Sequence, residues 1–132
     1  KKNKLFFKEN FKRILIFSGG FKEFIVPIVD KFGINESQVF GNQFIYNSWG
    51  DIIGIDQKNV MSSNKGKVKQ ARSLKLNGEI HVIGDGFTDY EIKSAGVATH
   101  FFAFTENIKR KNVCELSDQV LSKFDDYLLF IN

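Results

Sequence analysis

Ile80-His81-Val82-Ile83-Gly84-Asp85-Gly86-Phe87-Thr88-Asp89 is the stretch that decides the fold of this 132-residue chain. It opens as a short apolar run and breaks at Gly84, where glycine lets the backbone turn sharply. A buried parallel strand ends in this way when its carboxyl end opens into a ligand crevice. Asp85 and Asp89 stand one helical turn apart, a spacing that suits a hard cation such as Mg²⁺. The alternative is an ordinary strand-to-helix loop, with Asp85 as a turn residue and Asp89 on a solvated face.

Length and composition indicate a soluble globular domain, because 132 residues suit one domain or most of one. The sequence has no apolar run as long as a membrane span. The basic N-terminus lacks an unbroken apolar region and a small-residue cleavage site, so we predict no signal peptide. Cys114 is the sole cysteine, which excludes an internal disulfide and suits a reducing compartment. These absences together predict a cytoplasmic location.

The charge pattern argues against nucleic acid as a partner. The formal net charge is +4, and Lys109-Arg110-Lys111 is the one basic cluster, which we interpret as a solvated helix face. His81 and His100 are interpreted as structural residues. The sequence shows no His/Cys cluster with the spacing of a zinc site.

The N-terminal half begins with a helix ending near residue 12 and continues as a strand over 13–17 that stops at Ser18-Gly19-Gly20. An amphipathic helix over 21–32 follows, with Pro27 inside it and Gly33 as its stop signal. Ser18 suits a helix N-cap, and it also suits a phosphate held by its hydroxyl and the glycine amides. Both roles can hold together.

The rest of the chain alternates between strand and helix patterns. Residues 39–56 predict a β-hairpin or a pair of short strands, with Trp49 at the tip, packed or exposed. A short basic helix over 65–74 precedes the central strand. After Asp89 we predict a helix to Ser94, strand runs at 97–99 and 101–104, a helix near 107–113, and a last helix capped by Ser117 and carrying Val120, Leu121, Phe124 and Leu128. This alternation predicts an α/β fold with a mainly parallel sheet.

Three short motifs now stand in order: Ser18-Gly19-Gly20-Phe21 after a strand, Asn64-Lys65-Gly66 at a helix start, and Gly84-Asp85-Gly86-Phe87-Thr88-Asp89 after a strand. This order resembles the second, third and fourth motifs of the haloacid dehalogenase superfamily, in its phosphoserine phosphatase-like branch. The resemblance covers essentially the whole chain. It implies a three-layer Rossmann-like core forming a single partial domain over 1–132, with a β-hairpin insertion near 39–56.

The resemblance also implies roles for individual residues. Ser18, with Gly19 and Gly20, would bind the transferring phosphoryl group, and Thr88 would contact substrate where many members have Asn. Lys65 would neutralise the charge of phosphate and nucleophile, with Lys67 and Lys69 as weaker candidates. Asp85 would bind Mg²⁺, and Asp89 would bind metal-bound water or orient the lysine.

One motif of the superfamily is missing from these 132 residues. The nucleophile belongs to a first motif, an apolar strand ending in DxDx(T/V), and no Asp of this chain follows a strand in that pattern. The resemblance therefore implies the C-terminal part of a phosphatase, with the first strand and the helical cap lying in a missing N-terminal segment or fused domain. The isolated chain is expected to be inactive. Loss of the first strand would expose a sheet edge, which favours a homo-oligomer.

The function implied is Mg²⁺-dependent hydrolysis of a phosphate monoester through an aspartyl-phosphate. Phosphoserine is the favoured substrate, which would connect the protein with serine biosynthesis. One alternative is a related phosphatase for another small metabolite, such as a sugar phosphate or thiosugar phosphate. A second alternative is a non-catalytic regulatory or scaffold domain that keeps phosphate binding without turnover.

Overall fold

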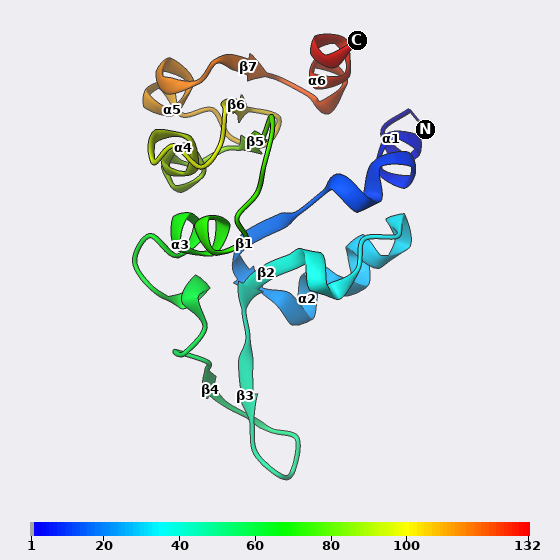
Figure 1. The fold of residues 1–132 in the computed structure, drawn as a ribbon. Helices are drawn as coiled ribbons and strands as arrows, with labels where there is room; N and C mark the ends of the chain where they lie inside the picture. The colour runs from blue at the N-terminus through cyan, green and yellow to red at the C-terminus, as the bar shows by residue number, and fades with distance from the viewer. Residues whose placement is uncertain (1) are drawn as a thin grey trace. The chain divides into compact units, whose positions relative to one another are not determined.

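The computed structural model describes residues 2–132 and divides the chain into two compact units, one ending at Gly66 and the other running from Lys67 to Asn132 (Figure 1). Each unit contains strands that pair in parallel, with helices in the connections. The α/β class predicted from the alternation of strands and helices is therefore confirmed.

The first unit is built around a parallel pair, β1 with β2, and an antiparallel hairpin, β3 with β4. Its elements are α1 (Lys2–Asn10), η1 (Phe11–Arg13), β1 (Ile16–Phe21), α2 (Lys22–Val29), η2 (Asp30–Phe32), η3 (Glu36–Gln38), β2 (Val39–Asn42), β3 (Phe44–Tyr46), β4 (Ile52–Ile55) and η4 (Val60–Ser62). Ile34, Val39 and Met61 are buried in this unit.

The first strand is longer than the sequence predicts. β1 includes Ser18-Gly19-Gly20 and ends at Phe21, because its pairing with β2 resumes after an irregularity, where Phe21 lies opposite Asn42. Phe21 therefore precedes α2, and the prediction that Ser18 is its N-cap is wrong. After α2, which contains Pro27, the chain continues as the 3₁₀ turn η2 and stops at Gly33 in the left-handed conformation, as predicted.

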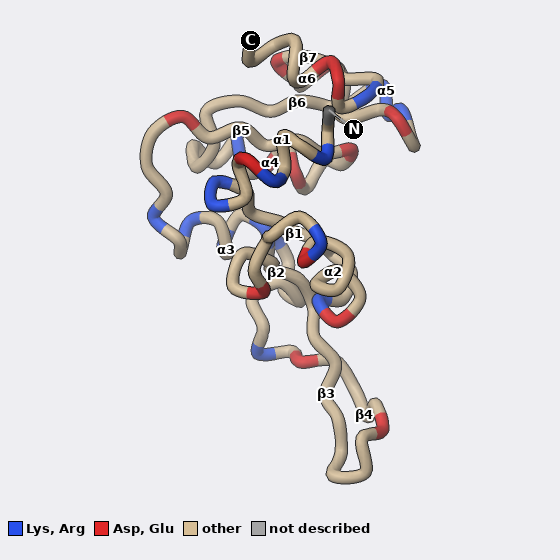
Figure 2. The backbone as a smooth tube through the Cα atoms, turned by 90° about the vertical axis from the view of Figure 1, so that its right-hand side faces the viewer, with Lys and Arg blue, Asp and Glu red and all other residues tan. Residues whose placement is uncertain are grey.

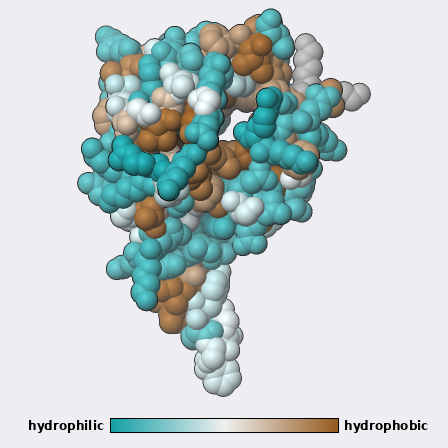
Figure 3. Space-filling view, in the orientation of Figure 1, coloured by the Kyte–Doolittle hydropathy of each residue, from teal (hydrophilic) through white to brown (hydrophobic). Residues whose placement is uncertain are grey.

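The hairpin β3–β4 forms within the range predicted for it, and Trp49 at its turn is 87% exposed. Figure 2 shows a largely uncharged tube along β3 and β4, and Figure 3 shows mostly brown and white residues there. Glu23 of α2 fixes its base, since its Oε2 atom accepts from the Phe44 N–H at 2.8 Å and from the Tyr46 hydroxyl at 3.3 Å. The hairpin is thus attached at one end and exposes apolar side chains elsewhere.

The second unit contains a three-stranded parallel sheet in the order β5-β6-β7. Its elements are α3 (Gly66–Ser73), which begins one residue before the unit, β5 (His81–Gly84), α4 (Phe87–Ser94), β6 (His100–Phe104), α5 (Lys111–Leu116), β7 (Gln119–Leu121) and α6 (Phe124–Ile131). The middle strand β6 supplies the fully buried Phe101 and Phe102, with Leu121 of β7 equally buried.

Three element predictions in this unit are wrong. Residues 97–99 form no strand, because the Val97 and Ala98 N–H groups both donate to the Ile92 carbonyl at 3.1 Å and close the end of α4. The helix predicted near 107–113 begins at Lys111 instead. The predicted last helix contains a strand, β7, which pairs with β6, and α6 begins only at Phe124. Ser117 does not cap α6, whose N-cap is Lys123. It follows α5, and its hydroxyl donates to the Cys114 carbonyl.

Within residues 2–132, every helix is too short or too polar to cross a membrane.

Candidate functional site

Asp85 is the first residue after β5, at the carboxyl end of that strand. Its side chain is 49% exposed, so the carboxylate is accessible to a ligand. Arg110 holds the loop, since its Nη1 atom donates to the Asp85 carbonyl at 2.9 Å and lies 3.7 Å from Asp85 Oδ1. Arg110 therefore anchors the loop through its backbone and also pairs with the half-exposed Asp85 carboxylate.

Asp89 differs from Asp85 in being buried, with 9% of its surface exposed. It is the third residue of α4, and its Oδ2 atom accepts from the Gly86 N–H at 3.2 Å. Its Oδ1 atom lies 2.8 Å from Nζ of Lys67 in an ion pair whose side chains are both largely buried. Both oxygens of Asp89 are thus engaged by the protein.

Packing against Asp89 requires glycine at residue 84, just before Asp85. A Cβ atom at Gly84 would lie 2.7 Å from Asp89 Cβ and would overlap the Asp89 carboxylate. A Cβ atom at Gly86 would find its nearest neighbour, Asp89 Oδ2, at 3.6 Å, an ordinary contact. Only the first glycine of the Gly-Asp-Gly motif is therefore required by packing.

Ser18, Gly19 and Gly20 lie at the end of β1 in the first unit. Ser18 Oγ accepts from the Gly20 N–H at 3.0 Å, and Asn42 donates to the Gly19 carbonyl at 3.0 Å. Both glycines are exposed, and Gly19 has open space where a Cβ atom would stand. The end of β1 is thus held by hydrogen bonds, and its backbone is accessible beside the Ser18 hydroxyl.

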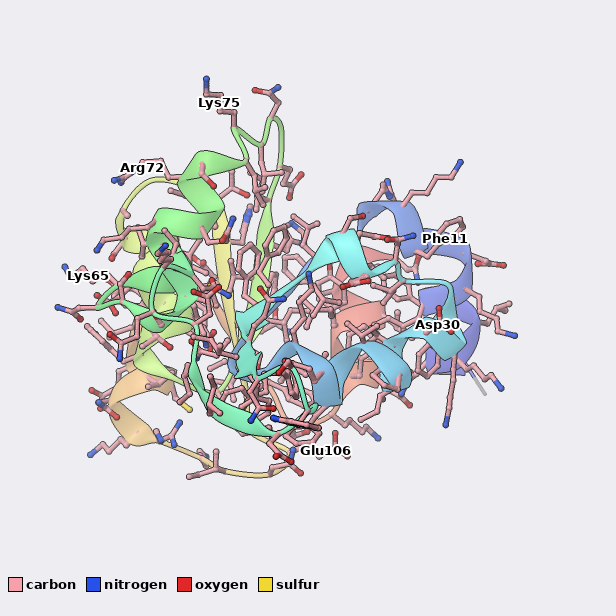
Figure 4. The ribbon with its side chains drawn as sticks, turned by 90° about the horizontal axis from the view of Figure 1, so that it is seen from below. Phe11, Asp30, Lys65, Arg72, Lys75 and Glu106 are labelled. Atoms are coloured by element: carbon pink, nitrogen blue, oxygen red, sulfur yellow. The ribbon has the colours of Figure 1, made fainter. Side chains whose placement is uncertain are left out.

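The predicted lysines fall in different units. Lys65 belongs to the first unit, is exposed, and has a φ of 57°, and Figure 4 shows its side chain extending away from the ribbon. Lys67, a weaker candidate from the sequence, forms the ion pair with Asp89 in the second unit. Lys69 is exposed on α3, and Thr88 is exposed at the second position of α4.

Two features of the second unit have no signal in the sequence: the role of Arg110 and a group of three possible metal ligands. The sequence predicts Arg110 on a solvated helix face, but this residue precedes α5 and binds the Asp85 loop. Glu79, His81 and His100 offer ligand atoms within 4.8 Å of one another, although no spacing in the sequence indicates such a cluster. Neither feature has a spacing motif, because each depends on contacts between distant segments of the second unit.

The donor set at the end of β5 fits Mg²⁺ with one direct protein ligand. Mg²⁺ is commonly bound by one or two carboxylates together with water and substrate phosphate. Asp85 offers an accessible carboxylate, whereas the two oxygens of Asp89 already accept from Lys67 and Gly86. Of the two roles expected for Asp89, this geometry favours orientation of a lysine.

The chain is similar in sequence to known phosphatases. It is 30% identical over 118 residues to the chloroplastic phosphoserine phosphatase of Arabidopsis thaliana, covering 87% of this chain and 40% of that protein. It is 28% identical over 119 residues to the human phosphoserine phosphatase, covering 88% of this chain and 52% of that protein. The chain thus spans about half the length of the relatives it matches or less. No protein-family model matches it.

The fold is also similar to a solved structure. A phosphoserine phosphohydrolase-like protein from Francisella tularensis superposes with a TM-score of 0.83 at 33% identity. The superposition covers 98% of this chain and 61% of the bacterial one. Nearly every element of the two units therefore has a counterpart in that protein.

Proposed function

We propose that this chain, a phosphoserine phosphatase-like member of the haloacid dehalogenase superfamily, is the C-terminal part of a Mg²⁺-dependent phosphomonoesterase. Phosphoserine is the favoured substrate, because the similar plant and human proteins bear the name phosphoserine phosphatase. The lone cysteine, Cys114, continues to favour a reducing compartment such as the cytoplasm.

One observation carries the proposal: a buried acid and an exposed acid stand one turn apart at the end of a parallel strand. Asp89 is ion-paired with Lys67 and fits over Gly84, while the Asp85 carboxylate is half-exposed beside Arg110. Burying a carboxylate is costly unless it is paired and hydrogen-bonded, as Asp89 is here. An ordinary strand-to-helix loop does not require this arrangement.

Within the second unit, the exposure and contacts of each residue indicate its proposed role. Asp85 would hold Mg²⁺, which when bound neutralises charge on a phosphoryl group and orients it. Lys67, held by Asp89, would contribute positive charge that favours a phosphate dianion. Arg110 would keep the Asp85 loop in place through the backbone carbonyl. Thr88, exposed in the first turn of α4, would contact the substrate.

Residues of the first unit are proposed for phosphate binding. The Ser18 hydroxyl would donate to a phosphoryl oxygen while it accepts from Gly20, and the Gly19 amide would add a second donor. Gly19 leaves the backbone open to a close approach by the ligand, and the Ser18 hydroxyl lies beside Gly20. Lys65 remains a candidate for charge neutralisation.

The nucleophile is proposed to come from a segment outside these 132 residues. The chain contains no strand followed by DxDx(T/V), and the superfamily uses an Asp of that motif to form an aspartyl-phosphate. Strand β5 pairs only with β6 among the described strands, which leaves one edge for another strand. We propose that the upstream segment pairs there, with a second copy of the chain as the alternative.

The test compares the 132-residue chain with the longer protein that includes the segment encoded upstream. Phosphate release from phosphoserine is expected from the longer protein and not from the isolated chain. In the longer protein, Lys67→Met should lower kcat about a hundredfold or more, because charge stabilisation in the transition state is lost. Lys75→Met, a matched change at an exposed position just after the same helix, should leave kcat near the wild-type value.

Two results would contradict the proposal. Turnover by the purified isolated chain would show that the nucleophile is present after all. A parent gene with no upstream DxDx(T/V) strand would favour a non-catalytic domain or a half-enzyme completed by another polypeptide. If the longer protein hydrolysed a sugar phosphate or thiosugar phosphate in place of phosphoserine, only the substrate assignment would change.

A further inference from the structure

Glu79, His81 and His100 form a cluster at the opposite end of β5 from Asp85. His81 and His100 are the first residues of β5 and β6 and lie directly opposite each other in the parallel register. Glu79 precedes His81 by two residues, the spacing at which extended backbone returns a side chain to the same side. His81 and Asp85 are four positions apart along an extended strand, roughly 13 Å, so the cluster is distinct from the candidate phosphatase site.

The ligand atoms of this cluster already converge. Glu79 Oε1 lies 2.7 Å from His81 Nε2 and 3.7 Å from His100 Nδ1, and all three atoms lie within 4.8 Å of one another. Zinc with ligands at about 2.0–2.2 Å in tetrahedral geometry holds neighbouring ligand atoms roughly 3.3 Å apart. The two distances from Glu79 fall on either side of that value. Because Glu79 is exposed, its side chain has room to adjust.

The outer contact of the His81 ring suits metal ligation, whereas the hydroxyl contact of His100 lies on the nitrogen that would bind the metal. His81 Nδ1 lies 2.8 Å from the Tyr127 hydroxyl of α6, which fixes the ring and leaves Nε2 directed at Glu79. Such a hydrogen bond to the second ring nitrogen accompanies nearly every metal-ligating histidine. The Thr99 hydroxyl donates to the Ile80 carbonyl at 2.8 Å and lies 3.0 Å from His100 Nδ1.

We infer that Glu79, His81 and His100 form a second cation site, selective for a divalent transition-metal ion of the zinc class. Two imidazoles and one carboxylate are ligands that such ions prefer, whereas Mg²⁺ prefers oxygen ligands and binds poorly to imidazole. Three protein ligands leave a fourth position for water. Bound metal would join the segment before β5, the start of β6 and, through Tyr127, helix α6. Its role is therefore to stabilise the second unit.

The test is metal titration of the purified 132-residue chain after chelator treatment. Calorimetry with Zn²⁺ should give one site per chain, and Co²⁺ should give the visible absorption of a tetrahedral centre. Zn²⁺ should raise the Tm of the chain. Excess Mg²⁺ should not displace the bound Zn²⁺. Glu79→Gln should weaken Zn²⁺ binding at least about tenfold, with a larger loss in His100→Gln. Glu79 is exposed, so the first variant keeps the fold intact.

Three control variants locate the site. Glu115→Gln removes another exposed carboxylate, Cys114→Ser removes the thiol, and Asp85→Asn alters the candidate Mg²⁺ site. All three should bind Zn²⁺ as tightly as the wild type. The inference would be overturned if wild type bound no Zn²⁺, if Glu79→Gln and His100→Gln bound it unchanged, or if Asp85→Asn or Cys114→Ser abolished binding.

Discussion

The backbone of Gly84 lies directly beside the Asp89 carboxylate, and this contact links the end of β5 to the first turn of α4. The ion pair with Lys67 and the hydrogen bond from Gly86 hold Asp89 in this position. A side chain at residue 84 would displace the carboxylate and strain both interactions. The motif glycine is therefore a packing requirement of the buried acid.

Gly84→Ala should lower the free energy of unfolding by about 1–3 kcal/mol, the usual cost of forcing an extra methyl group into a filled space. Gly86→Ala is the matched control, because its Cβ atom would make only ordinary contacts. Urea unfolding followed by circular dichroism measures both. Equal stability of the two variants would show that the Asp89 carboxylate does not occupy the space above Gly84.

Among the site residues, the acids can be predicted from sequence more clearly than the lysine. Asp85 and Asp89 stand at a fixed spacing after an apolar strand, so their location at the strand end follows from the pattern. Lys65 and Lys67 are two residues apart, and no spacing rule distinguishes them. The different positions of the two lysines depend on where α3 begins, which is at Gly66. Close packing requires glycine there, because a Cβ atom would lie 2.5 Å from the Val60 carbonyl oxygen.

The short connection before β7 depends on Asp118, which links this connection to α4 and β6. Its carboxylate accepts from the Phe101 N–H of β6 at 2.8 Å and from Lys93 of α4 at 2.9 Å. The hydrogen bond from Lys93, followed by that from the Phe101 N–H, holds the pKa of Asp118 below its usual value of 3.8. The folded state therefore favours the ionised carboxylate.

Asp118→Ala should destabilise the protein by about 1–3 kcal/mol near neutral pH, since the buried Phe101 N–H loses its acceptor. Asp118→Asn keeps an acceptor and loses the charge, so its effect should be smaller. Because the folded pKa lies below the unfolded one, the contribution of the charge is present above pH 3.8 and is lost as pH falls through the folded pKa. Thermal unfolding at about pH 7 and about pH 2.5 measures this. An Asn variant equally destabilised at both pH values would contradict the electrostatic origin.

Elements with a strong local pattern can be predicted from sequence, and elements that depend on pairing cannot. Helix α2 carries a continuous apolar stripe, and the 3₁₀ turn η2 that follows it ends at Gly33; both signals are local. Strand β7 has three residues, and the apolar Val120 and Leu121 also fit a helix that continues to Leu128. Pairing of Phe102–Phe104 with Gln119–Leu121 decides in favour of the strand, and this contact leaves no periodic signal.

At the scale of the whole molecule, the order of three motifs along the chain is enough to predict the fold class and the family. The chain divides into two compact units, and the first contains Ser18 and Lys65 while the second contains Asp85 and Asp89. The single partial domain stays a prediction. The Glu79, His81 and His100 cluster has no counterpart in the sequence pattern, because strand register brings the two histidines together. Composition and spacing carry no information about register between separate strands.

The central claim is that Asp85 holds the Mg²⁺ ion of a phosphomonoesterase, and the Mg²⁺ dependence of turnover tests it most directly. The measurement is phosphoserine hydrolysis by the longer protein, in its wild-type, Asp85→Asn and Glu79→Gln forms. Wild type and Glu79→Gln should lose turnover on chelation and recover it with Mg²⁺. Asp85→Asn should remain at least about a hundredfold slower at every Mg²⁺ concentration, since several kcal/mol of charge stabilisation are lost. Wild-type turnover in Asp85→Asn would contradict the account.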